Sequence, residues 1–290
     1  MKVAVTGAGG QLGTDLVRML RESGHGVAAF DRVALDIGNA EQVRTALAAE
    51  APDWVVNCAA YTNVDGAESD ADAAFAVNRD GAAHVAAGAA ACGARLVHVS
   101  TDYVFDGDRS RPWQETDPAS PLGVYGQSKW AGEEAVRAAL PQAVILRTAW
   151  VYGAHGRNFV KTILRLAAER DSLSVIDDQV GSPSWTRDIA TAIAALMAAG
   201  AEGTYHFTNE GVASWYDFAA AIVEEGRTRG FELRARVQPI PTEDYPLPAP
   251  RPAYSVLSKR KIRPLLAGPI PHWRASLRAM LEELKACADC

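Results

Sequence analysis

Tyr125 and Lys129 stand four residues apart in the stretch 124–134, VYGQSKWAGEE, which begins like a loop and continues like a helix. Delivery of a hydride to a carbonyl group leaves an alkoxide that needs a proton, and a phenol close to that oxygen can donate one. An ammonium group within about 4–6 Å lowers the pKa of such an acid by roughly 1–3 units. Because residues four apart on a helix are neighbours, we expect Lys129 to lower the pKa of Tyr125.

Ser100 and Thr101 follow the apolar run 96–99, which is typical of a buried strand. They therefore come at the carboxyl end of a predicted parallel strand, where open α/β sheets bind their ligands. A hydroxyl at this place can donate to the carbonyl oxygen that Tyr125 protonates. Lys129 has further donors for the ribose of a nicotinamide cofactor. We predict that Thr101, Tyr125 and Lys129 are the catalytic residues.

A glycine-rich loop, TGAGGQLG at residues 6–13, joins the first predicted strand to the first predicted helix. Gly7, Gly10 and Gly13 stand three apart. Glycine at these places leaves the backbone unhindered, so a pyrophosphate can approach the amide groups at the helix N-terminus. The loop predicts a dinucleotide-binding site.

Asp31 and Arg32 follow the second predicted strand. A carboxylate there suits the hydroxyls of the adenosine ribose and favours NADH, whereas a guanidinium can pair with the 2′-phosphate of NADPH. The predicted cofactor is therefore NADPH or NADH, with the preference left open. The residues predicted to contact it are Gly7, Gly10, Gln11, Leu12, Gly13, Asp31, Arg32, Asp36, Ile37, Ala59, Ala60, Tyr61, Ser100, Tyr125 and Lys129.

Short β-branched runs alternate with long amphipathic stretches through the first half of the chain. The predicted strands are 3–5, 27–30, 54–59, 96–100 and 143–148, and the predicted helices lie near 12–23, 40–50, 72–92 and 126–139. This alternation is typical of βαβ units. We therefore predict an α/β fold with a Rossmann-type doubly wound parallel sheet.

The pattern changes after residue 150, where a helix near 158–170 and a strand at 173–176 are followed by one more helix and strand, 189–197 and 204–208. We expect a smaller, interlaced C-terminal substrate domain. The dinucleotide-binding domain then covers 1–152 and 184–208, and the substrate domain covers 153–183 and 209–290. The segment 238–252 holds six of the 15 prolines, which predicts a long ordered loop or an edge strand. An amphipathic helix at 272–284 closes the chain.

The composition argues against several classes of partner. The net charge is −6, and no cluster of Lys and Arg provides a surface for nucleic acid. No apolar run approaches the roughly 18 residues of a membrane span. The N-terminus lacks the pattern of a secretion signal, so we expect a cytoplasmic protein. Four cysteines, the last two in a terminal C-x-x-C at Cys287 and Cys290, predict neither a disulfide nor a metal site, and Asp15 and Asp188 are isolated in the sequence.

The motifs together resemble the extended short-chain dehydrogenase/reductase superfamily, through the glycine loop, Asn57-Cys-Ala-Ala60, Ser100-Thr101 and Tyr125-x-x-x-Lys129. The sequence is more closely similar to the dTDP-4-dehydrorhamnose reductase family in the segments NCAAYTNVDGAE (57–68), HVSTDYVFDG (98–107), LRTAWVYG (146–153), LSVIDDQVGSP (173–183) and RPAYSVLS (251–258).

This resemblance implies that NADPH or NADH reduces the C4 keto group of a dTDP-sugar. It implies that Thr62, Thr101, Tyr103 and Trp150 lie near the sugar and that Asn158, Gln179 and Arg251 lie toward the nucleotide diphosphate. Some members of the family are associated with a divalent cation, but no compact set of ligands is visible in this sequence. Whether the chain forms a homodimer stays open.

Other functions share this fold and cofactor loop. A 4,6-dehydratase is disfavoured because its Asp-Glu pair after the threonine is replaced here by Asp102-Tyr103. Another dTDP-4-keto-6-deoxyhexose reductase and a nucleotide-sugar 4-epimerase remain alternatives. A non-catalytic, cofactor-binding regulatory subunit is the alternative from another class. It would have no need for the complete set of Thr101, Tyr125 and Lys129.

Overall fold

A parallel six-stranded sheet forms the centre of the protein, in a computed structural model that describes the backbone of residues 1–288 and the side chains of residues 1–286. The spatial order is β10-β5-β4-β3-β1-β2, and every neighbouring pair is parallel. The strands are β1 (Lys2–Thr6), β2 (Gly26–Phe30), β3 (Trp54–Asn57), β4 (Arg95–Thr101), β5 (Val144–Thr148) and β10 (Gly203–His206). The prediction of a doubly wound α/β fold is confirmed.

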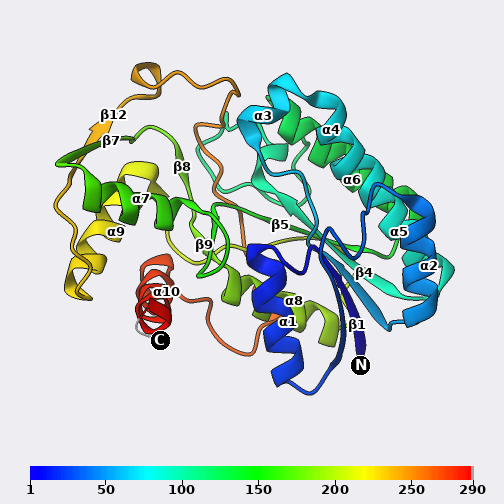
Figure 1. The fold of residues 1–290 in the computed structure, drawn as a ribbon. Coiled ribbons are helices and arrows are strands. Elements are labelled where there is room, and N and C mark those ends of the chain that lie inside the picture. The colour runs from blue at the N-terminus through cyan, green and yellow to red at the C-terminus, as the bar shows by residue number, and fades with distance from the viewer. Residues whose placement is uncertain (289–290) are drawn as a thin grey trace.

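Helices cover both faces of this sheet (Figure 1). One face carries α1 (Gln11–Glu22) and α8 (Thr186–Ala198), and the other carries α2 (Ala40–Glu50), α5 (Ala82–Ala91) and α6 (Val124–Ala139). Val3 and Val5 pack into the core under α1 and α8, whereas Ala4 packs into the core under the other helices. Because alternate side chains of a strand point to opposite faces, the buried strands are apolar at nearly every position.

The strand order creates a crevice at the carboxyl ends of β1 and β3. The chain goes from β1 outward to β2 and then returns past β1 to β3. Connections that leave a strand in opposite directions open a space between them, and open α/β sheets bind ligands there. Thr6 and Asn57 end the two strands, and the Thr6 hydroxyl donates to Asn57 Oδ1 at 2.7 Å.

The single helix predicted near 72–92 is divided into several pieces. They are α4 (Ala71–Phe75), a π-helical turn, η1 (Ala76–Gly81), and α5, and a further short helix that was not predicted, α3 (Val64–Ser69), precedes them. Asn63 and Asp70 each accept a backbone amide hydrogen bond as the N-cap of the helix that follows, so the chain restarts twice. A periodicity of apolar residues does not show such restarts, because caps interrupt the backbone bonds without interrupting the buried face.

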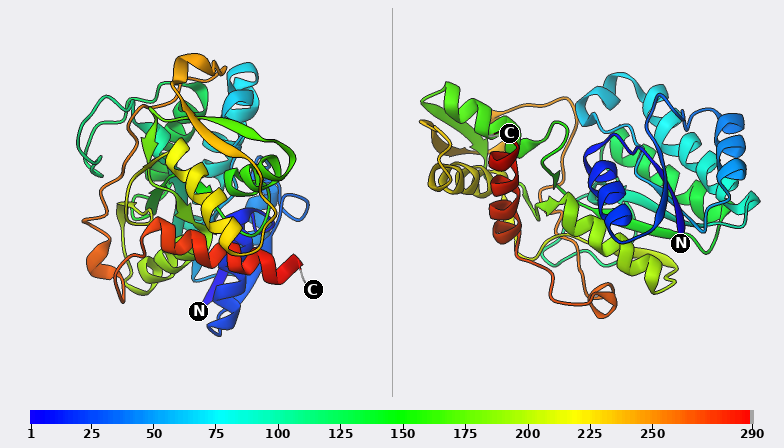
Figure 2. Two further views of the ribbon diagram at one scale, coloured as in Figure 1. Left: turned by 90° about the vertical axis from the view of Figure 1, so that its left-hand side faces the viewer. Right: turned by 60° about the horizontal axis from the view of Figure 1, so that its bottom comes forward.

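A second, smaller lobe lies beside the sheet and contains α7, α9 and α10 (Figure 2). Its elements are α7 (Phe159–Glu169), α9 (Trp215–Thr228), α10 (Trp273–Ala288) and the parallel pair β7 (Ser172–Ile176) and β12 (Arg236–Ile240). Two short pairs join β6 (Val151–Tyr152) to β9 (Ser184–Trp185) and β8 (Val180–Gly181) to β11 (Ala213–Ser214). A core of its own holds this lobe together.

The chain passes between the two lobes more than once. After α7 and β7 it returns to the sheet, where α8 packs against α1 and β10 pairs with β5. Ile262 and Ile270, which lie in the range assigned to the substrate domain, also pack into the core of the sheet. The division into the two predicted domains stays a prediction.

The proline-rich segment 238–252 begins in β12, a strand of a two-stranded sheet, and continues as the short 3-10 helix η3 (Thr242–Asp244) and an ordered loop. Both alternatives predicted for this segment are therefore present. A further 3-10 helix, η4 (Arg263–Leu265), precedes α10, which runs to Ala288 and so beyond the predicted end at residue 284.

None of the described helices has both the length and the apolar character that crossing a membrane requires. Among the described side chains, Cys58 and Cys92 are free thiols. The terminal C-x-x-C, Cys287 to Cys290, lies outside the described side chains.

Candidate active site

The glycine loop fits a dinucleotide pyrophosphate. Gly7 has φ +67°, and a Cβ there would lie 2.6 Å from the backbone nitrogen of Ala59, while a Cβ on Gly13 would overlap the backbone of Gly7. Gly10 is the N-cap of α1 and has no side chain that could cap its amides. The amide groups of the first turn therefore have no side-chain cap, and the positive end of the helix dipole lies behind them. Gln11 and the buried Leu12 and Gly13 follow.

Asp31 and Arg32 lie exposed just after β2, as predicted. Asp31 Oδ1 accepts hydrogen bonds from the amides of Val33 and Ala34 at 2.9 and 2.8 Å, so this oxygen closes the turn. The other oxygen of Asp31 is left for a ribose. The Arg32 guanidinium makes no hydrogen bond or ion pair with the described residues.

Three more of the predicted cofactor residues follow the end of β3. Ala59 donates its amide to Asn57 Oδ1 at 3.1 Å, and Ala60 follows in the same partly buried turn. Tyr61 exchanges two backbone hydrogen bonds with the Asn78 side chain at 2.9 and 3.1 Å.

Two of the predicted cofactor residues are less available than the sequence indicates. Ile37 is only 4% exposed and packs in the core beside Gly81, so any contact of Ile37 with an adenine uses its backbone. Asp36, next to it, is exposed and accepts the amide of Gly38 at 2.9 Å. Ser100 is 3% exposed, and its hydroxyl donates to Glu133. A contact of Ser100 with the cofactor is therefore also limited to its backbone.

Thr101 and Tyr125 meet at the carboxyl end of β4. The Thr101 hydroxyl donates to Asp102 Oδ1 at 3.1 Å and lies beside the Tyr125 phenol, where it lowers the pKa of that group. Burial has the larger effect and raises the pKa of Tyr125 to about 12, and Asp102 adds to the increase. The phenol is therefore neutral at physiological pH and still holds the proton that an acid must donate.

Lys129 is 2% exposed, and its ammonium donates to the Val99 carbonyl on β4 at 2.8 Å. Burial lowers the pKa of Lys129 to about 8, while Glu133 and Cys58 act in the opposite direction. The prediction that Lys129 lowers the pKa of Tyr125 is wrong for this structure, because the ammonium is bound to the strand and burial of the phenol dominates.

Sequence reasoning missed the residues that seat α6. A Cβ on Gly126 would overlap the Tyr103 carbonyl, and a Cβ on Gly132 would overlap the Asn78 carbonyl, so glycine allows the helix to approach both. The Asn78 amide also donates to the Ser128 hydroxyl at 3.0 Å, and Ser128 donates to the Tyr125 carbonyl at 2.8 Å. The available signal was the pair of glycines six residues apart in an otherwise helical pattern.

The residues predicted near the sugar stand on separate elements around this point. Tyr103 lies in the short 3-10 helix η2 (Asp102–Val104), and its ring packs edge-on against Tyr125 with a centroid distance of 5.5 Å. Thr62 is exposed in the loop before α3. The structure therefore places Tyr103 directly against Tyr125 and Thr62 at an exposed position before α3.

Trp150 is held in an unusual conformation. Its φ of 47° is in the left-handed region, which a bulky residue rarely adopts. The indole stacks on Trp215 with centroids 3.6 Å apart, and its edge lies against Gly181, where a Cβ would not fit. One face of Trp150 is thus covered by the second lobe, so a sugar could use only its other face.

The three residues predicted toward the diphosphate are each held by a partner. The Arg251 guanidinium forms a two-pronged ion pair with Asp65, with nitrogen–oxygen distances of 3.0 and 2.8 Å, and this bond lowers the pKa of Asp65. Gln179 is buried and donates to Thr242 at 3.0 Å.

Asn158 differs from these two because it contacts the glycine loop. It caps α7 by accepting the Lys161 amide, and its own amide donates to Gln11 Oε1 at 3.0 Å and to the Gly153 carbonyl at 2.7 Å. All of its polar atoms therefore have protein partners, which favours a role in holding Gln11.

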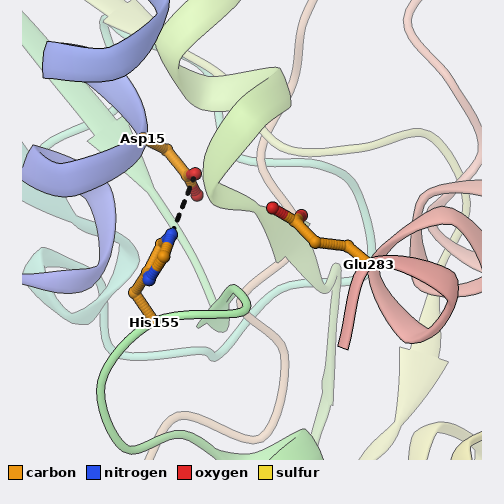
Figure 3. A group of neighbouring side chains, drawn as sticks. All are labelled: Asp15, His155 and Glu283. Carbon is orange, nitrogen blue, oxygen red and sulfur yellow. Dashed lines mark ion pairs between the residues drawn. The ribbon is translucent and has the colours of Figure 1, made fainter. Parts of the chain in front are cut away.

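Asp15 is not isolated in the structure, in contrast to its place in the sequence. Figure 3 shows Asp15 on α1, His155 on a loop and Glu283 on α10 pointing toward one another, and their ligand atoms lie within 4.8 Å. Arg18 pairs with Asp15 at 2.8 Å, and Arg187 pairs with Glu283. Asp188 also has partners, since it accepts hydrogen bonds from Asn209 and Ser276. The two guanidinium groups already balance the carboxylates of this cluster, so we assign no metal to it.

The fold and the site together define a class of protein. A doubly wound sheet with a glycine loop at its switch point binds a dinucleotide. A threonine at the end of β4, with a tyrosine and a lysine one helical turn apart on α6, is the arrangement expected of an extended short-chain dehydrogenase/reductase. Enzymes of this class use NAD(P) to transfer a hydride.

Comparisons with known proteins identify the family within that class. The chain belongs to the family described as "RmlD substrate binding domain", whose model matches residues 1–286. The spore coat polysaccharide biosynthesis protein SpsK of Bacillus subtilis is 44% identical over 99% of each chain. The dTDP-4-dehydrorhamnose reductase of Mycobacterium tuberculosis is 46% identical over 97% of this chain and 92% of its own. The crystal structure of the dTDP-4-dehydrorhamnose reductase of Bacillus anthracis, in complex with NADP, superposes with a TM-score of 0.92 at 39% identity, over 97% and 99% of the two chains.

Proposed function

We propose that this protein reduces the C4 keto group of dTDP-4-dehydro-L-rhamnose with NADPH or NADH and forms dTDP-L-rhamnose. The observation that carries the proposal is the meeting of Thr101 and the neutral phenol of Tyr125 at the end of β4, with Lys129 behind them. The relatives named dTDP-4-dehydrorhamnose reductase support the choice of substrate.

In this proposal each side chain has one task. The reduced nicotinamide, when bound, supplies the hydride that goes to C4 of the sugar. Tyr125 donates its proton to the oxygen that becomes negative, and Thr101 turns its hydroxyl from Asp102 to the same oxygen. The charged Lys129 is fixed by the Val99 carbonyl and offers its other two N–H groups to the ribose of the cofactor.

The second lobe supplies the substrate contacts in this proposal. Tyr103, Thr62 and the uncovered side of Trp150 surround the sugar, and Gln179 and Arg251 lie toward the diphosphate. Asn158 acts through Gln11 of the glycine loop. We further propose that the protein works in the cytoplasm. Its mass in solution tests whether it forms a homodimer.

A direct assay tests the activity. The purified protein is mixed with dTDP-4-dehydro-L-rhamnose and NADPH or NADH, and the absorbance of the reduced nicotinamide is followed. We expect oxidation of the cofactor only when the sugar nucleotide is present, and an NMR spectrum of the product with the C4 configuration of L-rhamnose. In a second assay, a 4-hydroxy sugar nucleotide and NAD replace the keto sugar and reduced cofactor, and formation of its C4 epimer without net change of the cofactor would instead identify an epimerase.

Cofactor preference should respond to the two residues after β2. Asp31→Asn keeps the oxygen that closes the turn but removes the charge that repels a 2′-phosphate, so kcat/KM for NADPH relative to NADH should rise about tenfold. Arg32→Ala should shift the same ratio about tenfold in the other direction. If neither variant moves the ratio threefold, these two residues do not distinguish the cofactors.

The pH dependence of kcat/KM should report Lys129. Because burial lowers the pKa of Lys129 to about 8, the ammonium is charged below that pH and neutral above it. The fall should therefore appear in kcat/KM, which reports the groups of the free protein, as the pH rises through about 8. Lys129→Arg keeps its charge at every accessible pH, so this fall should disappear even if the variant is slower. An alkaline fall that persists in Lys129→Arg would assign it to another group.

A further inference from the structure

A buried ion-pair network lies directly behind the catalytic residues. Glu133 stands one helical turn after Lys129 on α6, and its side chain has no solvent exposure. Its carboxylate accepts hydrogen bonds from Ser100 Oγ at 2.6 Å, from Arg147 Nε and Nη2 at 2.8 and 2.7 Å, and from Arg137 Nη2 at 2.7 Å. Four donors therefore converge on one carboxylate.

The donors come from the elements that must be aligned in the active site. Ser100 immediately precedes Thr101 on β4, and Arg147 lies directly opposite Ser100 on the neighbouring strand β5. Glu133 lies on the helix that carries Tyr125 and Lys129. The network thus joins α6, which carries Tyr125, to β4, which carries Thr101.

The network leaves Glu133 no part in the chemistry itself. Burial by itself would raise the pKa of Glu133, but Arg147, Ser100 and Arg137 together outweigh it and the pKa is lowered, so the carboxylate stays charged. Arg147 is 2% exposed and also contacts the Phe105 ring, with its guanidinium carbon 5.1 Å from the centroid. Both oxygens of the carboxylate are already used, so it is not available to a substrate.

The energetics favour a role in alignment over a role in stability. The attraction within a buried ion pair exceeds the free energy of desolvating its charges by little. Apolar residues of similar size often stabilise a fold as well. Its short, charged hydrogen bonds are directional, however, and allow one placement of the helix against the strands. A displacement of about 1 Å in an active site can lower a rate by roughly 100-fold.

We propose that Glu133 is a positioning residue, which through Ser100 and Arg147 fixes the Tyr125 and Lys129 helix against the Thr101 strand. The proposal rests on the roles given above to Thr101, Tyr125 and Lys129. It assigns a function to Glu133, a residue outside the set predicted for the site.

The same carboxylate also bears on the charge of Lys129, which lies one helical turn away on α6. The titratable and charged groups around the pair are Arg137 on α6, Arg147 on β5, His98 on β4, Cys58 after β3 and His206 on β10. Among the groups that act on the pKa of Lys129, Glu133 opposes the effect of burial most strongly. Removal of its charge should therefore lower the pKa of Lys129 and move the alkaline fall of kcat/KM to lower pH.

Three variants test the proposal, with turnover, KM, the pH profile and Tm measured for each. Glu133→Gln removes the charge and keeps the shape. Ser100→Ala leaves the pair of Glu133 and Arg147 in place and removes only the bond to β4. Glu225→Gln is the matched control, because Glu225 is also buried and accepts bonds from Arg229, Arg274 and Arg278, but on α9 in the second lobe.

For Glu133→Gln we expect kcat to fall at least tenfold with little change in KM, and the alkaline fall to begin about half a pH unit or more lower. Ser100→Ala should lower kcat at least threefold and leave the pH of the alkaline fall unchanged. Glu225→Gln should lower Tm but keep kcat and the pH profile. The contrast with Glu225→Gln separates positioning from stability.

Several results would overturn the proposal. One is that Glu133→Gln keeps a kcat within twofold of that of the unaltered protein and that its alkaline fall stays at the same pH. Another is a loss of kcat in Glu225→Gln equal to that in Glu133→Gln. If Glu133→Gln does not fold, Ser100→Ala decides, and a kcat within twofold refutes the positioning role. Tyr125→Phe is assayed in parallel, since its full activity would refute the catalytic assignment itself.

Discussion

Tyr125→Phe is expected to lower turnover by about 10²–10⁴ while NADPH or NADH still binds. The substitution keeps the ring that packs against Tyr103 and removes only the hydroxyl beside Thr101. Without that proton the oxygen formed at C4 stays negative, and Asp102, the other acid beside Thr101, already accepts the Thr101 hydroxyl at 3.1 Å. Turnover is measured at saturating sugar nucleotide and cofactor, and cofactor binding is measured separately by calorimetry.

Tyr205→Phe provides the control for this experiment. Tyr205 is a buried tyrosine on β10 in the core of the sheet and has no proposed role in the reaction. Its loss of a hydroxyl should leave turnover within twofold. If Tyr125→Phe retains more than half of the activity, Tyr125 is not the proton donor.

Arg251→Ala is expected to raise KM for the dTDP-sugar by about 10- to 100-fold and to leave the affinity for the cofactor unchanged. A guanidinium suits the paired oxygens of a diphosphate, and Arg251 is ordered by a proline-rich loop that has few backbone bonds of its own. In the structure its donors are held by Asp65 and by the Ala249 carbonyl. Steady-state kinetics with both substrates measure the effect.

Asp65→Asn separates the two roles that Arg251 could have. If Arg251 binds the diphosphate, weakening its bond to Asp65 leaves the guanidinium more available, so KM should stay the same or fall. If Arg251 only ties the loop to α3 through Asp65, both variants should raise KM alike. An unaltered KM in Arg251→Ala, or an equal loss for both ligands, would remove Arg251 from the substrate site.

The alternation of apolar runs predicted all six strands of the sheet and most of the helices on it. This succeeded because strands buried on both faces are apolar at nearly every position, and because amphipathic helices repeat their buried face every three to four residues. The glycine loop could also be predicted, since only glycine allows Gly7 to approach the backbone of Ala59. These are properties of short segments and their immediate neighbours.

The restarts at Asn63 and Asp70 and the π-helical turn at Ala76–Gly81 could not be predicted from periodicity. Asn78 in that turn bonds to Tyr61 and to Ser128, which lie 17 residues before it and 50 residues after it. The conformation of the turn is thus set by partners far away in the chain. A pattern of apolar residues carries no information about such polar contacts.

Local features could therefore be predicted from the sequence alone. They are the strands, the phosphate loop, the threonine at a strand end, and the tyrosine and lysine on one helix. The pKa values of those side chains were decided by the folded molecule. The i, i+4 spacing suggested that Lys129 lowers the pKa of Tyr125, but the fold bonds the ammonium to Val99 and buries the phenol, so that pKa rises to about 12. Glu133 likewise meets Ser100 and Arg147 only after β4, β5 and α6 have packed. Spacing along a helix limits which groups can be neighbours, whereas desolvation and hydrogen bonding depend on every element that surrounds them.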